Sequence, residues 1–473
     1  MSANEKPQAM PLGWAVFCLV FLLGSMICSV VWINIPIHIN LLASISVTLA
    51  VAWHNGKSWD ELSDALEYGG KICIIPTIIM MMVGVLIAAW IACGTVPMII
   101  YWGLKLINPS IFLVTAAVIC AVVSIATGSS WSTAGTVGVA LVGIGAGLGI
   151  NPGMTAGAII SGAYLGDKMS PMSDTTNLAA AVSEGDLFDH IRSMMYTTCP
   201  SFVIALVIYG VLGMQFSVHG VDSELVSATL KAIEENFVMS PLLLIPPVIV
   251  IGMAIKKYPS IPTLLIATLV AALLAYFIQD RSFGEIVKTL DSGYRVSSGL
   301  PQFDTLVNRG GLQSMLWTAA LGILGMLYGA IMEKTGLLTG LLERIKPIIS
   351  SVGGLITTVI MTNIILLAAT ASQTLAIVVG GRVFVSEFKK KHLLPQVLSR
   401  TLEDSGTIVS PLIPWSLCGV YMSGTLGVPA LDFVPYAFFC WICPMIAIVY
   451  GFTGKFVWKT GEIPSKYTYD DER

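Results

Sequence analysis

Residues 166–177 read GDKMSPMSDTTN, a polar and charge-bearing stretch set between long apolar segments. A second such stretch, LEDSGTIVSP, occupies residues 402–411. Carboxylates inside a membrane helix are costly, so they are rarely kept there without a task. Two carboxylate-bearing stretches, each interrupted by Gly and Pro and each in its own half of the chain, therefore predict an ion-coupled transporter.

The composition is that of an integral membrane protein. The chain has 473 residues, of which 55% are hydrophobic and only 11% are charged, whereas a soluble protein carries about 25% charged residues. Apolar stretches of helix-spanning length recur along the chain, which favours a helical bundle over an outer-membrane barrel with its short alternating segments. The net charge of −3 and the lack of a long basic tract exclude a nucleic-acid partner.

The fold class expected from these features is all-α, a polytopic membrane protein of two related repeats with broken helices and re-entrant hairpins. The expected domains are a first transmembrane repeat at 1–216, a polar linker with an interfacial helix at 217–239, a second repeat at 240–458 and a polar tail at 459–473. Membrane spans are predicted at 12–34, 37–54, 72–94, 109–127, 153–168, 193–215, 240–256, 260–279, 315–333, 352–370, 405–427 and 433–455.

The internal repeat rests on matching segments in the same order. Ser58–Leu62 resembles Ser282–Ile286, and Thr127–Thr133 resembles Thr370–Thr374. The charged stretches follow in each half, as is usual in secondary transporters. Whether the repeats are parallel or inverted stays open, as does whether 128–148 and 371–392 are re-entrant hairpins or broken spans.

A cluster of hydroxyl groups suggests a cation site. Thr127–Thr136 holds six hydroxyl residues in ten, and hydroxyls and freed carbonyls are hard ligands that suit sodium. Close helix packing through small residues is the structural alternative, but the matching segment in the second half favours a site. The predicted neutral ligands are Ser129, Ser130, Thr133, Asn177, Ser372 and Thr407.

In the first charged stretch, Gly166 and Pro171 are expected to break the helix and free backbone carbonyls. Asp174 is the preferred ion-binding carboxylate, and the alternative is a solvated loop. A transported sodium ion is expected at Asp174, Asn177 and Ser130.

Three further charged residues are given supporting or proton-relay roles: Asp167, Lys168 and Glu403. Asp167 precedes Lys168 directly, so the two either neutralise each other or hold the helix break together. In the second stretch Asp404 is the preferred carboxylate, because sodium and a proton can compete for such a group. Glu403 is expected to pair with Arg400 on the same helical face.

Three residues are possible substrate contacts: Arg382, Trp131 and Trp415. An arginine can clamp a carboxylate with two parallel hydrogen bonds, although Arg382 can equally cap a hairpin carbonyl. The tryptophans lie beside the polar stretches, where they either shape a gate or pack.

At these residues the chain resembles the NhaC family of sodium:proton antiporters within the ion-transporter superfamily. The resemblance rests on residues 166–177, on Glu403–Thr407 followed by Ser410-Pro411, and on Thr127–Thr133, and it covers nearly the whole chain. It implies a multi-pass protein of the inner (cytoplasmic) membrane, with related halves and hairpins that meet broken helices near the midplane.

The resemblance further implies sodium expelled against entering protons, with no cofactor and no enzymatic activity. Some members of the family exchange malate for lactate and others move amino acids, so a sodium- and proton-coupled organic anion exchanger or an amino-acid transporter is the alternative. The lack of an Arg/Lys cluster at the candidate site disfavours a dianionic cargo. The expected partners are Na⁺, H⁺, a small carboxylate or amino acid in the alternative, the lipid bilayer, and a second copy in a homodimer.

Overall fold

The computed structural model describes residues 9–28, 36–218, 223–343, 351–463 and 465. Apart from a single bridge between Leu393 and Lys459, the described residues form helices and loops only. The first half contains α1 (Leu12–Cys28), α2 (Ile37–His54), α3 (Trp59–Ala92), α4 (Thr95–Leu106), α5 (Phe112–Thr127), α6 (Ser130–Thr133), α7 (Val139–Gly147), α8 (Pro152–Met169), α9 (Asp174–Val182) and α10 (Leu187–Val218).

The remaining helices are α11 (Ser223–Asn236), α12 (Ile245–Ile255), α13 (Ser260–Phe277), α14 (Phe283–Ser292), α15 (Pro301–Val307), α16 (Leu312–Lys334), α17 (Leu337–Glu343), α18 (Val352–Thr370), α19 (Gln373–Lys390), α20 (Pro395–Leu402), α21 (Leu417–Leu426), α22 (Ala430–Phe433) and α23 (Phe438–Thr453). Among the described residues, seven helices are long and apolar enough to cross a membrane, or up to nine if two bent pairs each count as a span. The predicted all-α, polytopic class is confirmed.

The predicted span at 405–427 is not a continuous helix. The segment 405–427 divides into a π-helical turn, η6 (Glu403–Thr407), a short 3₁₀ turn, η7 (Ser410–Leu412), and α21. Pro411 and Pro414 lack the N–H that would continue the helical ladder. The chain is therefore broken next to the second charged stretch. The first break, at residues 170–173 between α8 and α9, also contains a proline, Pro171.

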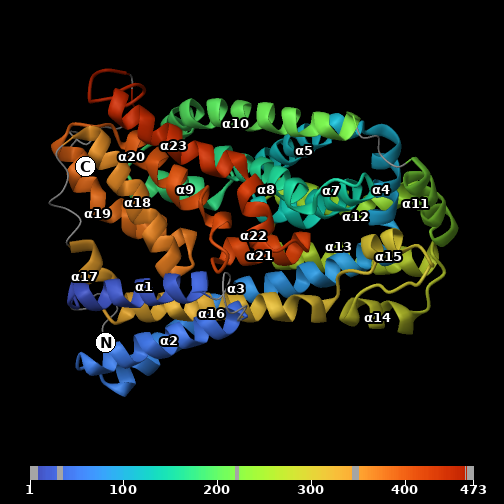
Figure 1. Cartoon of the computed structure of the whole chain (residues 1–473), viewed down its shortest axis with the longest axis horizontal. Helices are drawn as coiled ribbons and strands as arrows, with labels where there is room; N and C mark the ends of the chain where they lie inside the picture. The colour runs from blue at the N-terminus through green and yellow to red at the C-terminus, as the bar shows by residue number, and fades with distance from the viewer. Residues whose placement is uncertain (1–8, 29–35, 219–222, 344–350, 464, 466–473) are drawn as a thin grey trace.

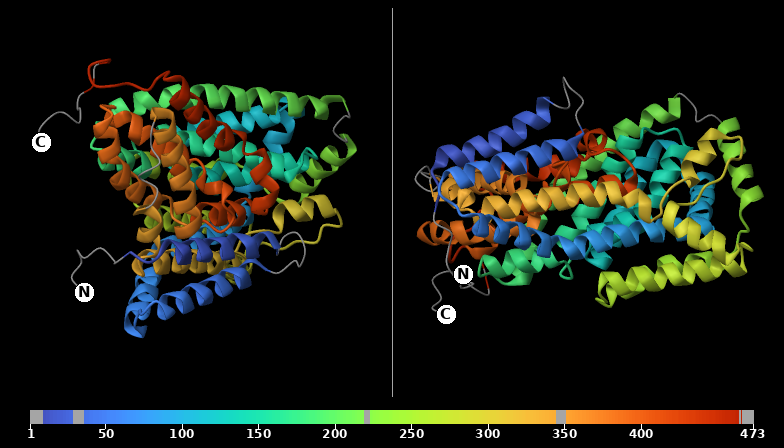
Figure 2. Two further views of the ribbon diagram at one scale, coloured as in Figure 1. Left: turned by 60° about the vertical axis from the view of Figure 1, so that its left-hand side comes forward. Right: turned by 90° about the horizontal axis from the view of Figure 1, so that it is seen from below.

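Two layers are visible in the fold. Helices α1, α2, α3 and α16 pack on one another along one side of the molecule, and the broken helices lie on the other side (Figures 1 and 2). The predicted linker 217–239 contains α11, on which Ala232 and Ile233 are buried while Lys231 and Glu235 face outward. The start of the predicted tail is held by the bridge from Lys459 to Leu393, and most of the rest of it lies outside the described residues.

The two predicted hairpins have the same tip geometry. α5 ends before Gly128 in the left-handed region (φ 69°), and the Ser129 hydroxyl then caps α6 by accepting from the Ser132 N–H at 3.2 Å. α18 ends before Ala371 (φ 55°), and the Ser372 hydroxyl accepts from the Leu375 N–H at 3.4 Å. Each polar segment thus begins a new helix after a single tight turn.

The two hairpins enter the bundle from opposite ends. α5 begins beside the C-terminal part of α10, where Gly213 faces the Ser110 carbonyl. α18 begins beside the end of α23, where Gly353 faces Phe452. Figure 1 shows the corresponding placement, with α5 and α18 under opposite halves of α10. This arrangement favours inverted over parallel repeats.

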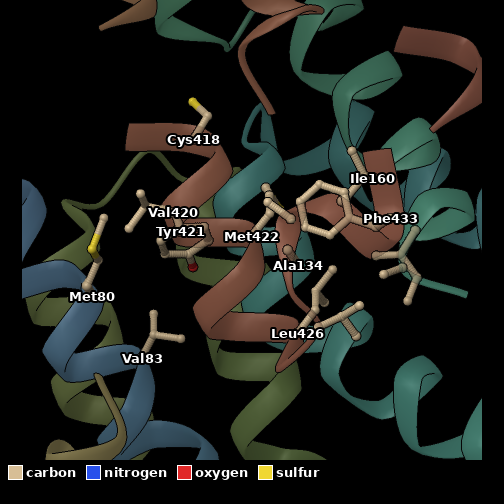
Figure 3. Packing of buried hydrophobic residues seen from close by; sticks show 14 of the residues in the cluster. Met80, Val83, Ala134, Ile160, Cys418, Val420, Tyr421, Met422, Leu426 and Phe433 are labelled. Atoms are coloured by element: carbon tan, nitrogen blue, oxygen red, sulfur yellow. The ribbon is translucent and has the colours of Figure 1, made fainter. Parts of the chain in front are cut away.

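α21 is the helix that joins the two layers. Its Tyr421, Met422 and Leu426 are buried between α3, which contributes Met80 and Val83, and the helices around α8 (Figure 3). An apolar helix shorter than a full span is stable here because it is surrounded by protein rather than by lipid. The side chains of α21 are therefore in position to line a site between the layers.

Small residues let α5 and α8 approach closely enough to fix the first break. A Cβ on Gly162 would lie 2.1 Å from the Ala117 carbonyl oxygen, and one on Gly166 would lie 2.3 Å from the Ile125 nitrogen. The Ser124 hydroxyl also donates to the Ala163 carbonyl at 2.5 Å. This close packing of small residues is typical of membrane helix pairs, and it sets the position of the last turn of α8.

Gly162→Ala is expected to lower the stability of the protein by about 1–3 kcal/mol, because the added methyl group must displace the α5 backbone. The measurement is the melting temperature of the detergent-purified protein. Gly252→Ala on α12 is the matched control, since a Cβ there would have no neighbour within 4 Å. Equal melting temperatures for the two variants would contradict this account of the α5–α8 contact.

Candidate functional site

The last turn of α8 presents two buried charged side chains in different directions. Asp167 is 7% exposed and Lys168 is fully buried. Because successive residues of an α-helix point about 100° apart, Asp167 faces the hairpin tip of the first half while Lys168 faces the second half. The helix then ends at Ser170, and α9 begins after Ser173.

Asp167 is held by two hydroxyl groups. Ser130 Oγ donates to one carboxylate oxygen at 2.6 Å, and Ser173 Oγ donates to the other at 2.7 Å. These two serines come from the first turn of α6 and from the residue that precedes α9. The hydroxyl-rich segment therefore contributes one hydrogen bond to Asp167, and the charged stretch that contains Asp167 contributes the other.

Asp167 opens onto a cavity with a volume of about 1090 Å³. The cavity lies between α3, the α5–α6 tip, the start of α9, the α12–α13 loop and α21. Its polar lining consists of Thr127, Ser129, Trp131, Ser132, Thr136, Asp167, Ser173, Asp174, Thr175, Asn177, Lys257, Tyr258, Ser260, Thr263, Gln373 and Tyr421. We call it the main cavity.

An aromatic pair forms part of its wall. The rings of Trp131 and Tyr421 stack at 4.0 Å with an interplanar angle of 10°, and the Tyr421 hydroxyl donates to the Trp131 carbonyl at 2.9 Å. Trp131 lies on α6 and Tyr421 on α21, so the pair connects the first-half hairpin to the second half. The Thr127 hydroxyl is buried and has no hydrogen-bond partner among the described residues, so it is free to accept a ligand.

The structure brings some of the predicted ion ligands to the main cavity and leaves others away from it. Ser129, Asp174 and Asn177 line it, and Ser130 reaches it through Asp167. The Asn177 amide donates to the carbonyls of Pro171 and Ser173, so it supports the break. The predicted ligands outside the lining are Thr133, Ser372, Asp404 and Thr407.

Lys168 and Asp404 form a fully buried ion pair between the two halves. Thr197 of α10 donates to Asp404 Oδ1 at 3.0 Å, and the Cys443 thiol of α23 does so at 3.1 Å. Lys168 Nζ also contacts Thr197 Oγ1 at 3.2 Å and Cys443 Sγ at 3.2 Å. Four helical elements thus meet at one pair of charges.

Glu403 is fully buried, and neither of its carboxylate oxygens has a hydrogen-bond partner among the described residues. The hydroxyls of Thr407 and Thr175 lie nearby without meeting hydrogen-bond geometry. The predicted pair of Glu403 with Arg400 is wrong. Arg400 instead directs its guanidinium to the Ser193 carbonyl, at 3.5 Å, and over the ring of Trp458. The backbone at Glu403 still has helical angles (φ −68°, ψ −42°), so the pairing fails because Arg400 contacts these other groups.

The other predicted substrate contacts lie apart from the main cavity. Arg382 is exposed on α19, and Trp415 donates its ring N–H to the Ala368 carbonyl at 2.9 Å. Neither is among the lining residues. Trp415 thereby braces the end of α18 in the second-half hairpin, which is the packing alternative for this residue.

Several lining residues were not singled out from the sequence. Ser173 belongs to the quoted stretch, and its place as the residue before α9 was the available signal. Tyr421 and Lys257 lie in segments with no polar motif, so only the folded arrangement reveals them.

Among the described residues, no group of three or more His, Cys, Asp or Glu side chains is arranged to hold a metal ion. A small cation at this site therefore depends on carboxylate, hydroxyl and carbonyl oxygens together.

Comparison with known proteins assigns this architecture to a family of carriers. A family model described as the Na⁺/H⁺ antiporter family matches residues 162–455. The Na⁺/H⁺ antiporter NhaC of Alkalihalophilus pseudofirmus is 36% identical over 96% of this chain and 98% of its own length.

The names of two other relatives include organic solutes. The malate-2H⁺/Na⁺-lactate antiporter of Bacillus subtilis is 34% identical over 91% of this chain and 92% of its own length. The arginine/ornithine antiporter ArcD of Halobacterium salinarum is 37% identical over 96% of this chain and 94% of its own length.

Removing one member of the Lys168–Asp404 pair is expected to be far more damaging than removing both. Asp404→Leu leaves an unpaired buried ammonium and should destabilise the protein by about 3–5 kcal/mol, whereas the double variant Lys168→Met/Asp404→Leu should recover most of that loss. Melting temperatures of wild type, both single variants and the double variant check this. Additive losses in the double variant would mean that the pair is not coupled.

Proposed function

Because the chain belongs to the Na⁺/H⁺ antiporter family, we propose that it exchanges sodium for protons through Asp167 at the main cavity and Glu403 behind it. The observation that carries the assignment is the contrast between these two buried carboxylates. Asp167 lines the cavity and accepts hydrogen bonds from two hydroxyls, whereas neither carboxylate oxygen of Glu403 has a hydrogen-bond partner in the described part of the chain. A pair of carboxylates in unlike surroundings suits competition between a cation and a proton.

Asp167 is the proposed sodium ligand. A sodium ion that enters the cavity sheds water and needs hard oxygen atoms in exchange. The Asp167 carboxylate, the Thr127 hydroxyl and the Ser129 side chain supply such atoms at the cavity wall. Asp174, at the exposed start of α9 on the same cavity, attracts the cation toward this wall.

Glu403 is the proposed proton carrier. An isolated buried carboxylate without a partner is held as the neutral acid, because the charged form is expensive away from water. Arrival of sodium at Asp167 supplies a nearby positive charge that favours the ionised form. The Lys168–Asp404 pair is already neutral, so its proposed role is to hold the two halves together while Asp167 and Glu403 change charge.

The proposed setting is the inner (cytoplasmic) membrane, as a multi-pass carrier rather than an enzyme. A proton gradient across such a membrane is the energy source that sodium:proton exchange requires. The opposed hairpins and doubly broken helices support a carrier, because each half can move against the other around a fixed site.

A second candidate function has a specific observation in its favour. The main cavity, at about 1090 Å³, is much larger than a bare sodium ion needs. Helices α6, α9 and α19 begin at or beside it, and helix N-termini favour anions. Exchange of a small carboxylate or amino acid together with sodium and protons is therefore the alternative, in line with the names of two relatives.

The direct test is a transport assay in proteoliposomes that carry a pH-sensitive dye. Vesicles loaded with sodium and diluted into sodium-free buffer should become acidic inside without any organic solute. Acidification only after malate, lactate or arginine is added would replace the sodium:proton reading with the organic exchanger. No response under any of these conditions would contradict both.

Asp167→Asn is expected to weaken the apparent sodium affinity about 30-fold, because one charge-assisted interaction of about 2 kcal/mol is lost. Glu403→Gln should keep sodium binding and lose the coupled proton movement. Both are measured in the same vesicles, with Asp432→Asn as the matched control on an exposed carboxylate. Wild-type exchange in Glu403→Gln would remove Glu403 from the mechanism.

A further inference from the structure

A second cavity, of about 290 Å³, lies at the end of the molecule that carries α14 and α15. It is enclosed by α3, α16, the end of α21 and the loops around α15. Its lining is Ile87, Arg295, Asn308, Arg309, Gly310, Ser314, Ser423, Gly424, Thr425 and Gly427. We call it the arginine cavity. It has no lining residue in common with the main cavity.

The charge of the arginine cavity is entirely positive. Arg295 and Arg309 both line it, and no Asp or Glu does. Within the described part of the chain, neither arginine is within salt-bridge distance of a carboxylate. Two guanidinium groups that share a small cavity repel each other unless an anion lies between them. This pattern is the reverse of the main cavity, which two aspartates line.

Local hydrogen bonds hold the two arginines in place. Asn308 bridges the loop by accepting from the Val296 N–H at 2.7 Å and donating to the Val296 carbonyl at 2.8 Å. Arg295 donates to the adjacent Tyr294 carbonyl at 3.1 Å, and Arg309 donates to the carbonyl of Leu426. Each guanidinium has five N–H donors, so most of them remain available to a ligand. Hydroxyls of Ser423 and Thr425 line the same space.

The two cavities lie end to end along the same two helices. On α3, Val83 lines the main cavity and Ile87, one turn later, lines the arginine cavity. On α21, Tyr421 lines the main cavity, and the next turn lines the arginine cavity. A change in the hydrogen bonding at the end of α21 is therefore transmitted along this helix to the Trp131–Tyr421 pair.

We propose that the arginine cavity binds a small oxyanion, a carboxylate or a phosphate, between Arg295 and Arg309. The forked guanidinium matches the geometry of such groups with two parallel hydrogen bonds. The volume of about 290 Å³ is sufficient for one small anion or one lipid headgroup. This inference does not rest on the proposed sodium:proton exchange, because it concerns a separate cavity with separate residues.

The site has a consequence for α21. Arg309 is the residue that holds the last carbonyl of α21, at Leu426, beside the left-handed Gly427. A bound oxyanion shares the Arg309 guanidinium with this carbonyl and weakens the hydrogen bond at the end of the helix. Because Tyr421 is on the same helix, occupancy of the arginine cavity alters the wall of the main cavity. The site thus acts as a regulator rather than as part of the cation path.

The test uses potassium sulfate and potassium phosphate as probes on the detergent-purified full chain, at constant ionic strength against potassium chloride. Melting temperature against probe concentration should rise and saturate for wild type. Arg295→Gln should weaken the apparent affinity about tenfold or more. Lys288→Gln on α14, an exposed cation outside the cavity, should behave as wild type.

The remaining arms separate the possible anion sources and guard against misfolding. Arg309→Lys keeps a donor for Leu426 and should also weaken binding, so a folding defect in one variant leaves the other informative. Nanodiscs of phosphatidylglycerol that abolish the sulfate response, where phosphatidylcholine does not, identify a lipid headgroup. A response to free anions in both lipids identifies a soluble ligand. Non-saturating shifts that are equal in wild type and all variants would overturn the proposal.

Discussion

The buried ion pair between Lys168 and Asp404 is the constraint on which the arrangement of the two halves depends. Both side chains are fully buried, and α10 and α23 contribute Thr197 and Cys443 to the same cluster. Removing either partner would leave an unpaired charge away from water, so the ends of α8 and α20 must remain together. With Lys168 occupied in this way, Asp167 is left to face the main cavity, and Glu403 has no hydrogen-bond partner among the residues that the structure describes. The proposed exchange depends on this division of roles.

The sequence was sufficient for the class of the fold, and both charged stretches that it singles out lie at helix breaks. Composition predicts a polytopic helical protein, and Gly and Pro beside the charged stretches predict the breaks after Met169 and Thr407. The matched segments that begin at Thr127 and Thr370 predict equivalent re-entrant hairpins or broken spans, and the structure has the same tight turn in each. These features are local, because they follow from residues close together in the chain. The resemblance to a sodium:proton antiporter family is confirmed by the comparisons.

The roles of individual charges depend on contacts that the sequence does not contain. The sequence predicts a supporting role for Asp167 because Lys168 follows it, yet neighbouring residues of a helix point in different directions, and the partner of Lys168 comes from the second half. Glu403 and Arg400 have a helical spacing that suits pairing, but Arg400 instead contacts the Ser193 carbonyl and the ring of Trp458. Tyr421, Lys257 and the arginine cavity gather residues from distant segments without any motif. Such sites become visible only when the helices are packed.

The central claim is that sodium and a proton compete for one group of carboxylates, and proton release on sodium binding tests it most directly. Calorimetric titration of the purified protein with sodium, in buffers of different ionisation enthalpy, measures the number of protons released per ion bound. The account predicts net proton release in wild type near neutral pH, abolished in Glu403→Gln while sodium still binds. Sodium binding with the same heat in every buffer, and hence without proton release, would contradict it.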